Sequence, residues 1–195
     1  MSHFYAMLSR MKYINRWGLM RATRPESLSE HTLETAIITH ALITLGNARL
    51  SRGLDPGKGV LLALYHDAGE IITGDMPTPV KYHNRRIHDA YKEVEAVADE
   101  RLLGMLPGDL RGEYEPLFRP EGSADAYLPY VKAADKLSAL IKCAEELSAG
   151  NREFGEAQKA LFASPALLLP EAQMFMAECL PSYSLSLDEL SAERG

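Results

Sequence analysis

Residues Leu64–Lys81 read LYHDAGEIITGDMPTPVK, and three ionisable side chains stand close together in this otherwise apolar stretch. His66 and Asp67 are adjacent, and Glu70 follows within one helical turn of both. Residues three or four apart share a helix face, and adjacent residues lie about 100° apart around the axis. The spacing therefore predicts a helix that directs an imidazole and two carboxylates towards one region.

The loop after this helix supplies a further acid. Gly74 is expected to end the helix, and Asp75 follows it directly. The prolines at 77 and 79 restrict the backbone, so that Asp75 and Thr78 can be held in place at low entropic cost. An ordinary turn would explain the same residues. Lys81 closes the stretch, either as extra positive charge for a substrate or as a surface lysine.

Helix signals recur along the rest of the chain, and strand signals are scarce. Ser27 to Glu30 resembles a capping box, and the apolar residues that follow it at four-residue intervals predict a buried stripe from Leu33 through Ile37. His40 is expected in the core of that helix. Further helix starts or spans are expected at Asp55-Pro56, from Asn84 to about Leu106, from Asp125 to Ala149, and near 153–163 and 170–179. These signals predict an all-α fold with residues 1–195 as one domain.

The composition narrows the classes of function. The chain has 195 residues, 46% of them hydrophobic and 25% charged, with a net charge of -6. Non-specific binding to nucleic acid or to an anionic membrane needs a broad basic surface, which this charge disfavours. Two cysteines are too few for a disulfide framework or a thiolate zinc site. No apolar run approaches the roughly 20 residues that span a bilayer, and a cytoplasmic protein is expected.

Three separated places carry residue types that bind metals: His31, the pair His66-Asp67, and Asp135. Asp135 shares a helical face with Val131, so its carboxylate is expected to be partly buried. A buried carboxylate must be paired, protonated or bound to a metal. Each place also has an ordinary explanation, namely a basic partner for Asp135, a capping role for His31, and chance for the dipeptide.

The order of these residues resembles the HD-domain superfamily of metal-dependent phosphohydrolases, which are helical bundles. The resemblance implies that His31, His66, Asp67 and Asp135 together hold one divalent metal ion. Imidazole with carboxylate suits first-row transition ions. The ions expected here are cobalt, manganese, copper, nickel, iron or zinc.

Longer motifs resemble one branch of that superfamily, the bacterial 5′-deoxynucleotidases. The resemblance implies a homodimeric enzyme that hydrolyses deoxyribonucleoside 5′-monophosphates to deoxynucleosides and phosphate. The motifs are INRW (Ile14–Trp17), SEHT (Ser29–Thr32), YHDAGEIITGDMPTPVKY (Tyr65–Tyr82), KAADKL (Lys132–Leu137) and PSYSLSLDEL (Pro181–Leu190).

The resemblance also implies roles for individual residues. Arg16, a forked donor matched to phosphate, orients the scissile phosphate, and Trp17 lines the sugar pocket. Asp75 accepts a hydrogen bond from the sugar 3′-hydroxyl. Glu70 is expected to be the general acid or base, acting on the attacking water or on the leaving oxygen. The substrate is also expected to contact Thr78 and the metal ligands His31, Asp67 and Asp135. Without the resemblance, Glu70 would pass for a solvated helix-end acid and Trp17 for a core residue.

Three other functions remain open at this level. A triphosphohydrolase or an alarmone hydrolase would share the metal site, but it would need more basic residues than Arg16 and Lys81. A non-catalytic nucleotide sensor would have no need of Glu70. A purely structural helical bundle would bind no stoichiometric metal.

Overall fold

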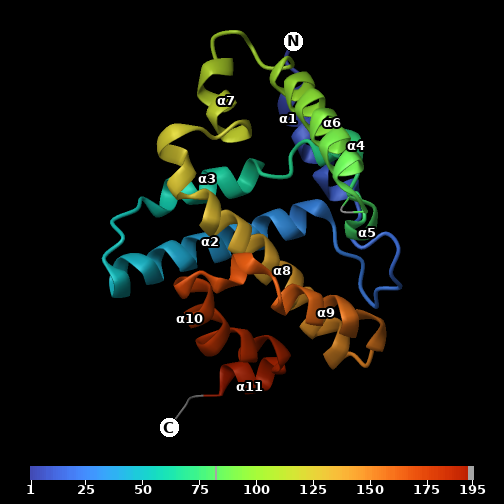
Figure 1. Cartoon of the computed structure of the whole chain (residues 1–195), viewed down its shortest axis with the longest axis vertical. Helices are drawn as coiled ribbons and strands as arrows, with labels where there is room; N and C mark the ends of the chain where they lie inside the picture. Colours follow the sequence, from blue (N-terminus) through green and yellow to red (C-terminus); the bar gives the residue numbers. More distant parts are fainter. Residues whose placement is uncertain (82, 193–195) are drawn as a thin grey trace.

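Helices form every named element in this computed structural model, which describes residues 1–81 and 83–192 (Figure 1). Only an isolated bridge between Asn15 and Ser27 pairs extended backbone within those ranges. The all-α prediction is confirmed. Tyr82, the last residue of the longest motif, and residues 193–195 lie outside the described residues. The α-helices are α1 (Phe4–Leu8), α2 (Leu28–Leu50), α3 (Pro56–Tyr65), α4 (Glu70–Thr73), α5 (Thr78–Lys81), α6 (Arg85–Leu103), α7 (Arg111–Phe118), α8 (Leu128–Ser148), α9 (Gly155–Phe162), α10 (Pro170–Glu178) and α11 (Leu187–Ser191).

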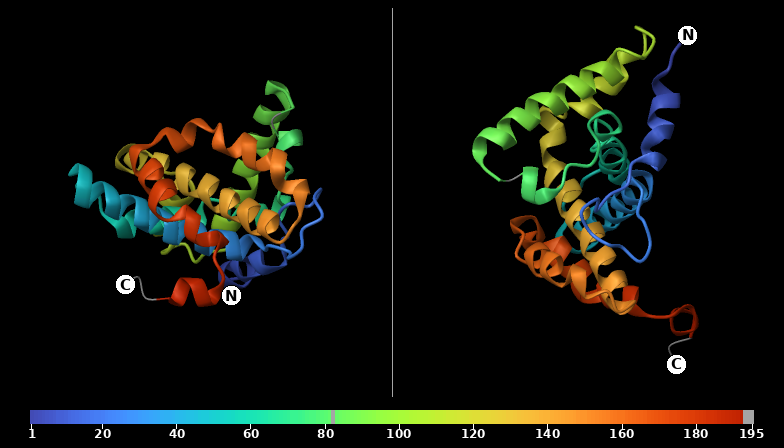
Figure 2. Two further views of the ribbon diagram at one scale, coloured as in Figure 1. Left: turned by 90° about the horizontal axis from the view of Figure 1, so that it is seen from below. Right: turned by 90° about the vertical axis from the view of Figure 1, so that its right-hand side faces the viewer.

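The centre of the molecule is built from α2, α3 and α8. Helix α2 packs against both of the others, and the ribbon of α8 crosses it in Figure 1. Helices α1 and α6 lie towards one end of the molecule, and α10 and α11 lie at the other (Figure 2). None of the helices in the described part of the chain is long and apolar enough to cross a membrane. The largest fully buried side chains between the central helices are Ile38, Leu42, Ile43, Leu137, Leu140 and Ile141.

The predicted helix starts at Ser27, Asp55 and Asn84 are present, whereas the helix predicted from Asp125 begins at Leu128, after the 3-10 turn Gly122–Ala126. Ser27 Oγ accepts a hydrogen bond from the Glu30 backbone N–H, and the Glu30 carboxylate accepts one from the Ser27 N–H, as a capping box requires. Asp55 caps α3 ahead of Pro56, and Asn84 caps α6. Each cap contributes about 0.5–2 kcal/mol to stability. The caps at Ser27 and Asp55 locate α2 and α3, whereas α8, which carries Asp135, begins without a side-chain cap.

The buried face of α2 differs from the predicted one. Leu33 and Ile37 are 59% and 60% exposed, and His40 is exposed as well. The face that packs against α3 and α8 instead carries polar residues such as His31 and Thr35 among the apolar ones. Because polar groups occupy this face, hydrophobic spacing could not identify it.

The helix predicted through His66 and Asp67 is interrupted. Helix α3 ends at Tyr65, and residues 66–69 form turns before α4 begins at Glu70. The bonds Ala68 N–H to Tyr65 O (3.1 Å) and Glu70 N–H to Asp67 O (3.0 Å) span three residues rather than four. Ala68 is fully buried in a cluster with residues of α1 and α6, which anchors the turn. Gly74 follows α4 with φ +75° and ψ 162°, a backbone conformation that is accessible to glycine and strained for residues with a Cβ.

Candidate metal centre and its surroundings

Four side chains from three distant parts of the chain meet at one point. His31 comes from the first turn of α2, His66 and Asp67 from the turn after α3, and Asp135 from α8. One nitrogen or carboxylate oxygen from each lies within 4.8 Å of the others. His31 is fully buried, and the other three are partly buried. The structure therefore brings together the complete set proposed as metal ligands.

The closest distances in this His–Asp cluster suit the ligands of one ion. His31 Nε2 lies 3.3 Å from Asp135 Oδ1 and 3.6 Å from Asp67 Oδ2. His66 Nε2 lies 3.1 Å from the same Asp67 oxygen. Nitrogen and oxygen ligands lie about 2.0–2.2 Å from a transition-metal ion, which puts neighbouring donor atoms about 3 Å apart.

The orientation of His66 also fits a metal. Its Nδ1–H donates to the backbone carbonyl of Ala63 over 2.7 Å. A neutral imidazole carries one proton, so Nε2 then presents its lone pair to the cluster. Nε2 is buried and makes no hydrogen bond of good geometry in the described structure. A buried nitrogen of this kind needs a partner, and a cation would supply one.

The charges in the cluster favour a cation as well. Burial alone would lower the pKa of His66, but the neighbouring charges of Asp67 and Asp135 outweigh it and raise the pKa to about 9. Burial acts against both carboxylates, yet His66 and His31 hold the pKa of Asp67 below its usual range. The pKa of Asp135 is lowered by His31 and by Lys136, whose Nζ lies 2.9 Å from Asp135 Oδ2. The carboxylates that draw a proton onto His66 would equally attract a divalent ion.

Glu70 lies beside the cluster with an unusual protonation equilibrium. Its side chain is largely buried, and Oε2 has no hydrogen-bond partner in the described structure. Burial, followed by the charges of Asp67 and Asp75, raises the pKa of Glu70 to about 8. A carboxyl group that holds its proton near neutral pH is suited to proton transfer.

Arg16 places a buried positive charge against the same cluster. Its side chain is 12% exposed, and Nη1 lies 3.8 Å from Asp67 Oδ2. Burial would lower the pKa of Arg16, but Asp135, Glu26 and the other nearby acids raise it, so the group stays charged. Nε donates to Glu26 Oε2 over 3.1 Å. A guanidinium fixed in this position could bind an anion that approaches the cluster.

Trp17 is held from three sides. Its backbone has φ +60°, uncommon for a residue other than glycine. Its N–H donates to Asp75 Oδ2 over 3.2 Å, and its indole Nε1–H donates to Glu26 Oε2 over 2.9 Å. The ring packs against the fully buried Phe154, with the ring centroids 5.2 Å apart. Trp17 and Asp75, predicted separately, are therefore direct neighbours.

Sequence reasoning missed Glu26. One oxygen of its carboxylate, Oε2, accepts hydrogen bonds from both Arg16 and Trp17. It lies in the segment before the capping box, with no periodicity or motif of its own. Its proximity in sequence to the INRW motif was the one available signal.

Thr78 and Lys81 differ in their exposure and in their contacts. Thr78 is the first residue of α5 and is exposed. Lys81 is not a simple surface lysine: Nζ donates to Glu95 Oε1 over 2.7 Å and lies 4.9 Å from the centroid of the Tyr91 ring. Its charge opposes the rise in the pKa of Glu70. Lys81 thus belongs to the electrostatic surroundings of the site through Glu70.

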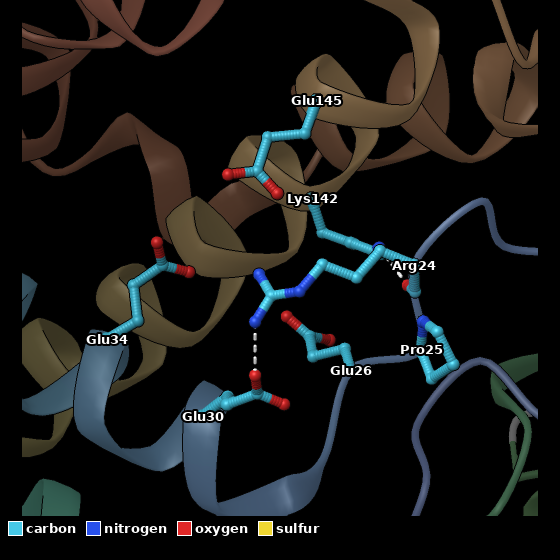
Figure 3. Close-up of a pocket in the computed structure, with 7 residues that line it drawn as sticks. All are labelled: Arg24, Pro25, Glu26, Glu30, Glu34, Lys142 and Glu145. Carbon is cyan, nitrogen blue, oxygen red and sulfur yellow. Dashed lines mark hydrogen bonds and ion pairs between the residues drawn. The ribbon is translucent and has the colours of Figure 1, made fainter. Parts of the chain in front are cut away.

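A cavity of about 110 Å³ lies in an acidic region near Glu26 (Figure 3). Helix α2 contributes Glu30 and Glu34 to it, and α8 contributes Lys142 and Glu145. The His–Asp cluster does not line this cavity. Glu26, which accepts hydrogen bonds from Arg16 and Trp17, also lines this cavity.

Comparison with known proteins gives a consistent result. The family described as "5′-deoxynucleotidase YfbR-like" matches residues 3–183. A 5′-deoxynucleotidase of Erwinia tasmaniensis is 49% identical over 193 residues, covering 98% of each chain. A 5′-deoxynucleotidase of Yersinia pestis is 48% identical over 194 residues, covering 99% of this chain and 98% of the relative.

Solved structures with lower identity share the fold. An HD-domain phosphohydrolase from Listeria innocua superposes with a TM-score of 0.78 at 21% identity, covering 93% of this chain and 88% of the other. The HD phosphohydrolase of cyanophage S-2L, bound to dA and one catalytic Zn²⁺ ion, superposes with a TM-score of 0.64 at 19% identity, covering 91% and 96%. At these identities the likeness establishes the helical fold alone.

Proposed function

This chain belongs to the YfbR-like 5′-deoxynucleotidase family, and we propose that it hydrolyses deoxyribonucleoside 5′-monophosphates to deoxynucleosides and phosphate. The relatives carry that activity in their names and match the chain over nearly its whole length. The HD phosphohydrolase of cyanophage S-2L, which has the same fold, was solved bound to dA and one catalytic Zn²⁺ ion.

One observation carries the proposal. His31, His66, Asp67 and Asp135 converge although three separate segments supply them. Two imidazoles and two carboxylates that face one another are the ligand types that hold a transition-metal ion. The four residues are therefore the proposed ligands of one first-row transition-metal ion. When bound there, such an ion supplies positive charge for phosphoryl oxygens and lowers the pKa of a water molecule.

Arg16 is the proposed phosphate-binding residue. Its Nε is occupied by Glu26, while Nη1 reaches towards Asp67 at the edge of the cluster. The guanidinium can therefore donate to a phosphate oxygen without losing the bond that fixes its position. The fixed charge would favour the phosphoryl group as it accumulates charge during bond cleavage.

Glu70 is the proposed proton-transfer group. With its pKa raised to about 8, it holds its proton at neutral pH in the metal-free protein. It is proposed to transfer a proton in the reaction, either at the attacking water or at the leaving 5′-oxygen of the deoxynucleoside. The turn at 66–69 brings Glu70 close enough to Asp67 for the two carboxyl groups to influence each other.

Trp17 and Asp75 are the proposed sugar-binding residues. The indole ring, fixed by Glu26 and Phe154, offers an apolar surface to C2′ of a deoxyribose. A ribose 2′-hydroxyl against that surface would lose its water without gaining a partner. Asp75 Oδ2 accepts from the Trp17 N–H, which leaves its other oxygen available to a 3′-hydroxyl. Thr78 is proposed to complete this side of the substrate pocket.

Several finer points accompany the proposal. Residues 1–195 are proposed to act as one domain, since one apolar cluster joins α2, α3, α8 and α10. A homodimer is proposed from the family resemblance, and a cytoplasmic location from the free cysteines Cys143 and Cys179. No nucleic acid or membrane partner is proposed.

Product analysis tests the function. Purified protein is incubated with matched deoxy- and ribonucleoside 5′-monophosphates, and with a deoxynucleoside triphosphate, in the presence of a panel of divalent metals. We expect orthophosphate from the deoxynucleoside monophosphates and much less from their ribo counterparts. Release of pyrophosphate or tripolyphosphate as the main product would identify a different phosphohydrolase.

A further inference from the structure

The side of His31 that faces away from the metal centre is bonded to Ser138. Ser138 Oγ lies 2.9 Å from His31 Nδ1, and both side chains are fully buried. Ser138 follows Asp135 by one turn of α8. The same turn of α8 therefore places Asp135 on one side of the imidazole ring and Ser138 on the other.

The Ser138 hydroxyl is also bonded to Glu34. Its Oγ–H donates to Glu34 Oε2 over 2.6 Å. A carboxylate can only accept hydrogen bonds, and a serine hydroxyl has a single proton to give. Because Glu34 takes that proton, Ser138 Oγ must accept the hydrogen bond from His31 Nδ1–H.

The direction of the His31–Ser138 hydrogen bond determines whether the other ring nitrogen, Nε2, carries a proton. With the proton of the neutral imidazole on Nδ1, Nε2 presents its lone pair towards Asp67 and Asp135. Thr35 Oγ1 lies 3.4 Å from His31 Nε2 and, as a hydroxyl, can either donate or accept, so this contact is compatible with the state that Ser138 sets. His66 reaches the same state through a backbone carbonyl, whereas His31 reaches it through two side chains.

We propose that Ser138 and Glu34 are positioning residues that hold His31 in its metal-binding tautomer, with Glu34 acting through Ser138. The inference rests on the proposed metal centre and assigns two residues to it that no motif indicates. Partners of this kind on metal-binding histidines typically contribute about 10–100-fold in metal affinity.

A purely structural role would give a different result. The Ser138–Glu34 bond joins α8 to α2, and losing it could lower stability without touching the metal. Glu34 could also act simply as one more negative charge near the ion. Glu145 is the control for an effect of charge alone, because it lines the same cavity as Glu34 but comes from α8 (Figure 3). Glu145 has the charge of Glu34, and no hydrogen bond joins it to Ser138 among the described residues.

The test measures metal affinity in the whole protein, independently of turnover. Zinc and cobalt dissociation constants are determined by chelator competition for the wild type, Ser138→Ala, Glu34→Ala, the double variant and Glu145→Ala. Circular dichroism and thermal unfolding verify that each variant is folded. We expect Ser138→Ala and Glu34→Ala to bind about 10–100-fold more weakly, and Glu145→Ala to bind like the wild type. The double variant should bind no more weakly than Ser138→Ala, because Glu34 acts through Ser138.

The alternative outcomes are distinguishable. Two results would overturn the proposed positioning role while leaving the metal centre intact. One is wild-type metal affinity in Ser138→Ala, and the other is a full additional loss of metal affinity when Glu34→Ala is added to Ser138→Ala. Absence of stoichiometric metal in the wild type would overturn the proposed function and the positioning role of Ser138 and Glu34 together. If Ser138→Ala does not fold, Glu34→Gln replaces it. The amide oxygen of the new glutamine can still accept from Ser138, so Glu34→Gln should bind metal more tightly than Glu34→Ala. Equal losses of metal affinity in the two variants would contradict the positioning role.

Discussion

His31 Nε2 lies 3.3 Å from Asp135 Oδ1, although His31 begins α2 and Asp135 lies within α8. The packing of α2 against α8 sets this distance, so the metal centre depends directly on the central helix pair. With Asp67 3.6 Å from the same nitrogen, the fold concentrates negative charge around a buried imidazole. A bound cation should therefore strengthen the fold as well as serve the reaction.

Metal binding is expected to raise the melting temperature. A ligand present at 100 times its dissociation constant stabilises the folded state by about 2.7 kcal/mol. For a chain of this size that corresponds to a rise of about 5–10 °C. Differential scanning fluorimetry of chelator-treated protein, with and without added cobalt or zinc, measures it. The rise should disappear in Asp67→Ala, and an equal rise in that variant would place the ion elsewhere.

Glu70→Gln should lower kcat by about 10²–10⁴ because it removes the proton-transfer group. The side chain keeps its size, so metal content should equal that of the wild type. Steady-state phosphate release and elemental analysis on the same sample provide the two readings. Near-normal turnover in the variant would remove Glu70 from the mechanism.

Trp17→Ala should narrow the preference for deoxyribonucleotides. The loss of the ring gives a ribose 2′-hydroxyl access to water, which removes the penalty for an unpaired buried group. The measured quantity is the ratio of kcat/KM for a deoxynucleotide to that for its ribo counterpart. Trp17→Phe retains an apolar ring and is the control. An unchanged ratio in Trp17→Ala would show that Trp17 has a packing role only.

Glu26→Gln should raise KM more than it lowers kcat. Glu26 Oε2 accepts from both Arg16 and Trp17, and both bonds weaken because an amide oxygen is a weaker acceptor than a carboxylate. Looser positioning of the phosphate-binding guanidinium should weaken substrate binding several-fold, by about 1 kcal/mol. Glu145→Gln removes a charge from the same cavity without those bonds. Equal effects of the two substitutions would attribute the result to charge alone.

Acid should destabilise the protein through Glu146. Burial would raise the pKa of Glu146, but Lys142, the Thr23 N–H and Asn151 hold it well below its usual range. A carboxyl with a lowered pKa stabilises the fold above its unfolded pKa, about 4.3, and loses that contribution as the pH falls further.

Glu146→Gln isolates this contribution. The Lys142–Glu146 pair is only 5% and 1% exposed, and breaking a buried pair costs about 3–5 kcal/mol. Denaturant unfolding should show this loss at pH 7, and the gap between variant and wild type should shrink below about pH 4. A gap that stays constant down to pH 3 would contradict the assignment.

Much of the fold was predictable because its signals are local. The caps at Ser27, Asp55 and Asn84 each depend on a few neighbouring residues, and all three are present. The exposure of Leu33 and Ile37 was not predictable in this way. The neighbours of α2 along the rest of the chain decide which of its faces is buried.

In the site, too, some residues could be recognised from local sequence and others could not. His66 and Asp67 stood out by residue type and spacing, and the family resemblance assigned them to the metal, although they lie in a turn rather than in a helix. Glu26 and Ser138 were missed because their importance comes from partners distant in sequence or outside any motif. Hydrogen bonds across the fold define such residues, and a single sequence does not record them.

The most direct measurement of the central claim is a metal titration of chelator-stripped protein, with bound ions per chain and phosphate release from a deoxynucleoside 5′-monophosphate recorded together. The His–Asp cluster predicts that turnover rises in proportion to bound metal and saturates at one ion per chain, and that His66→Ala abolishes both. Full turnover in the stripped protein, or saturation unaffected by His66→Ala, would contradict the account.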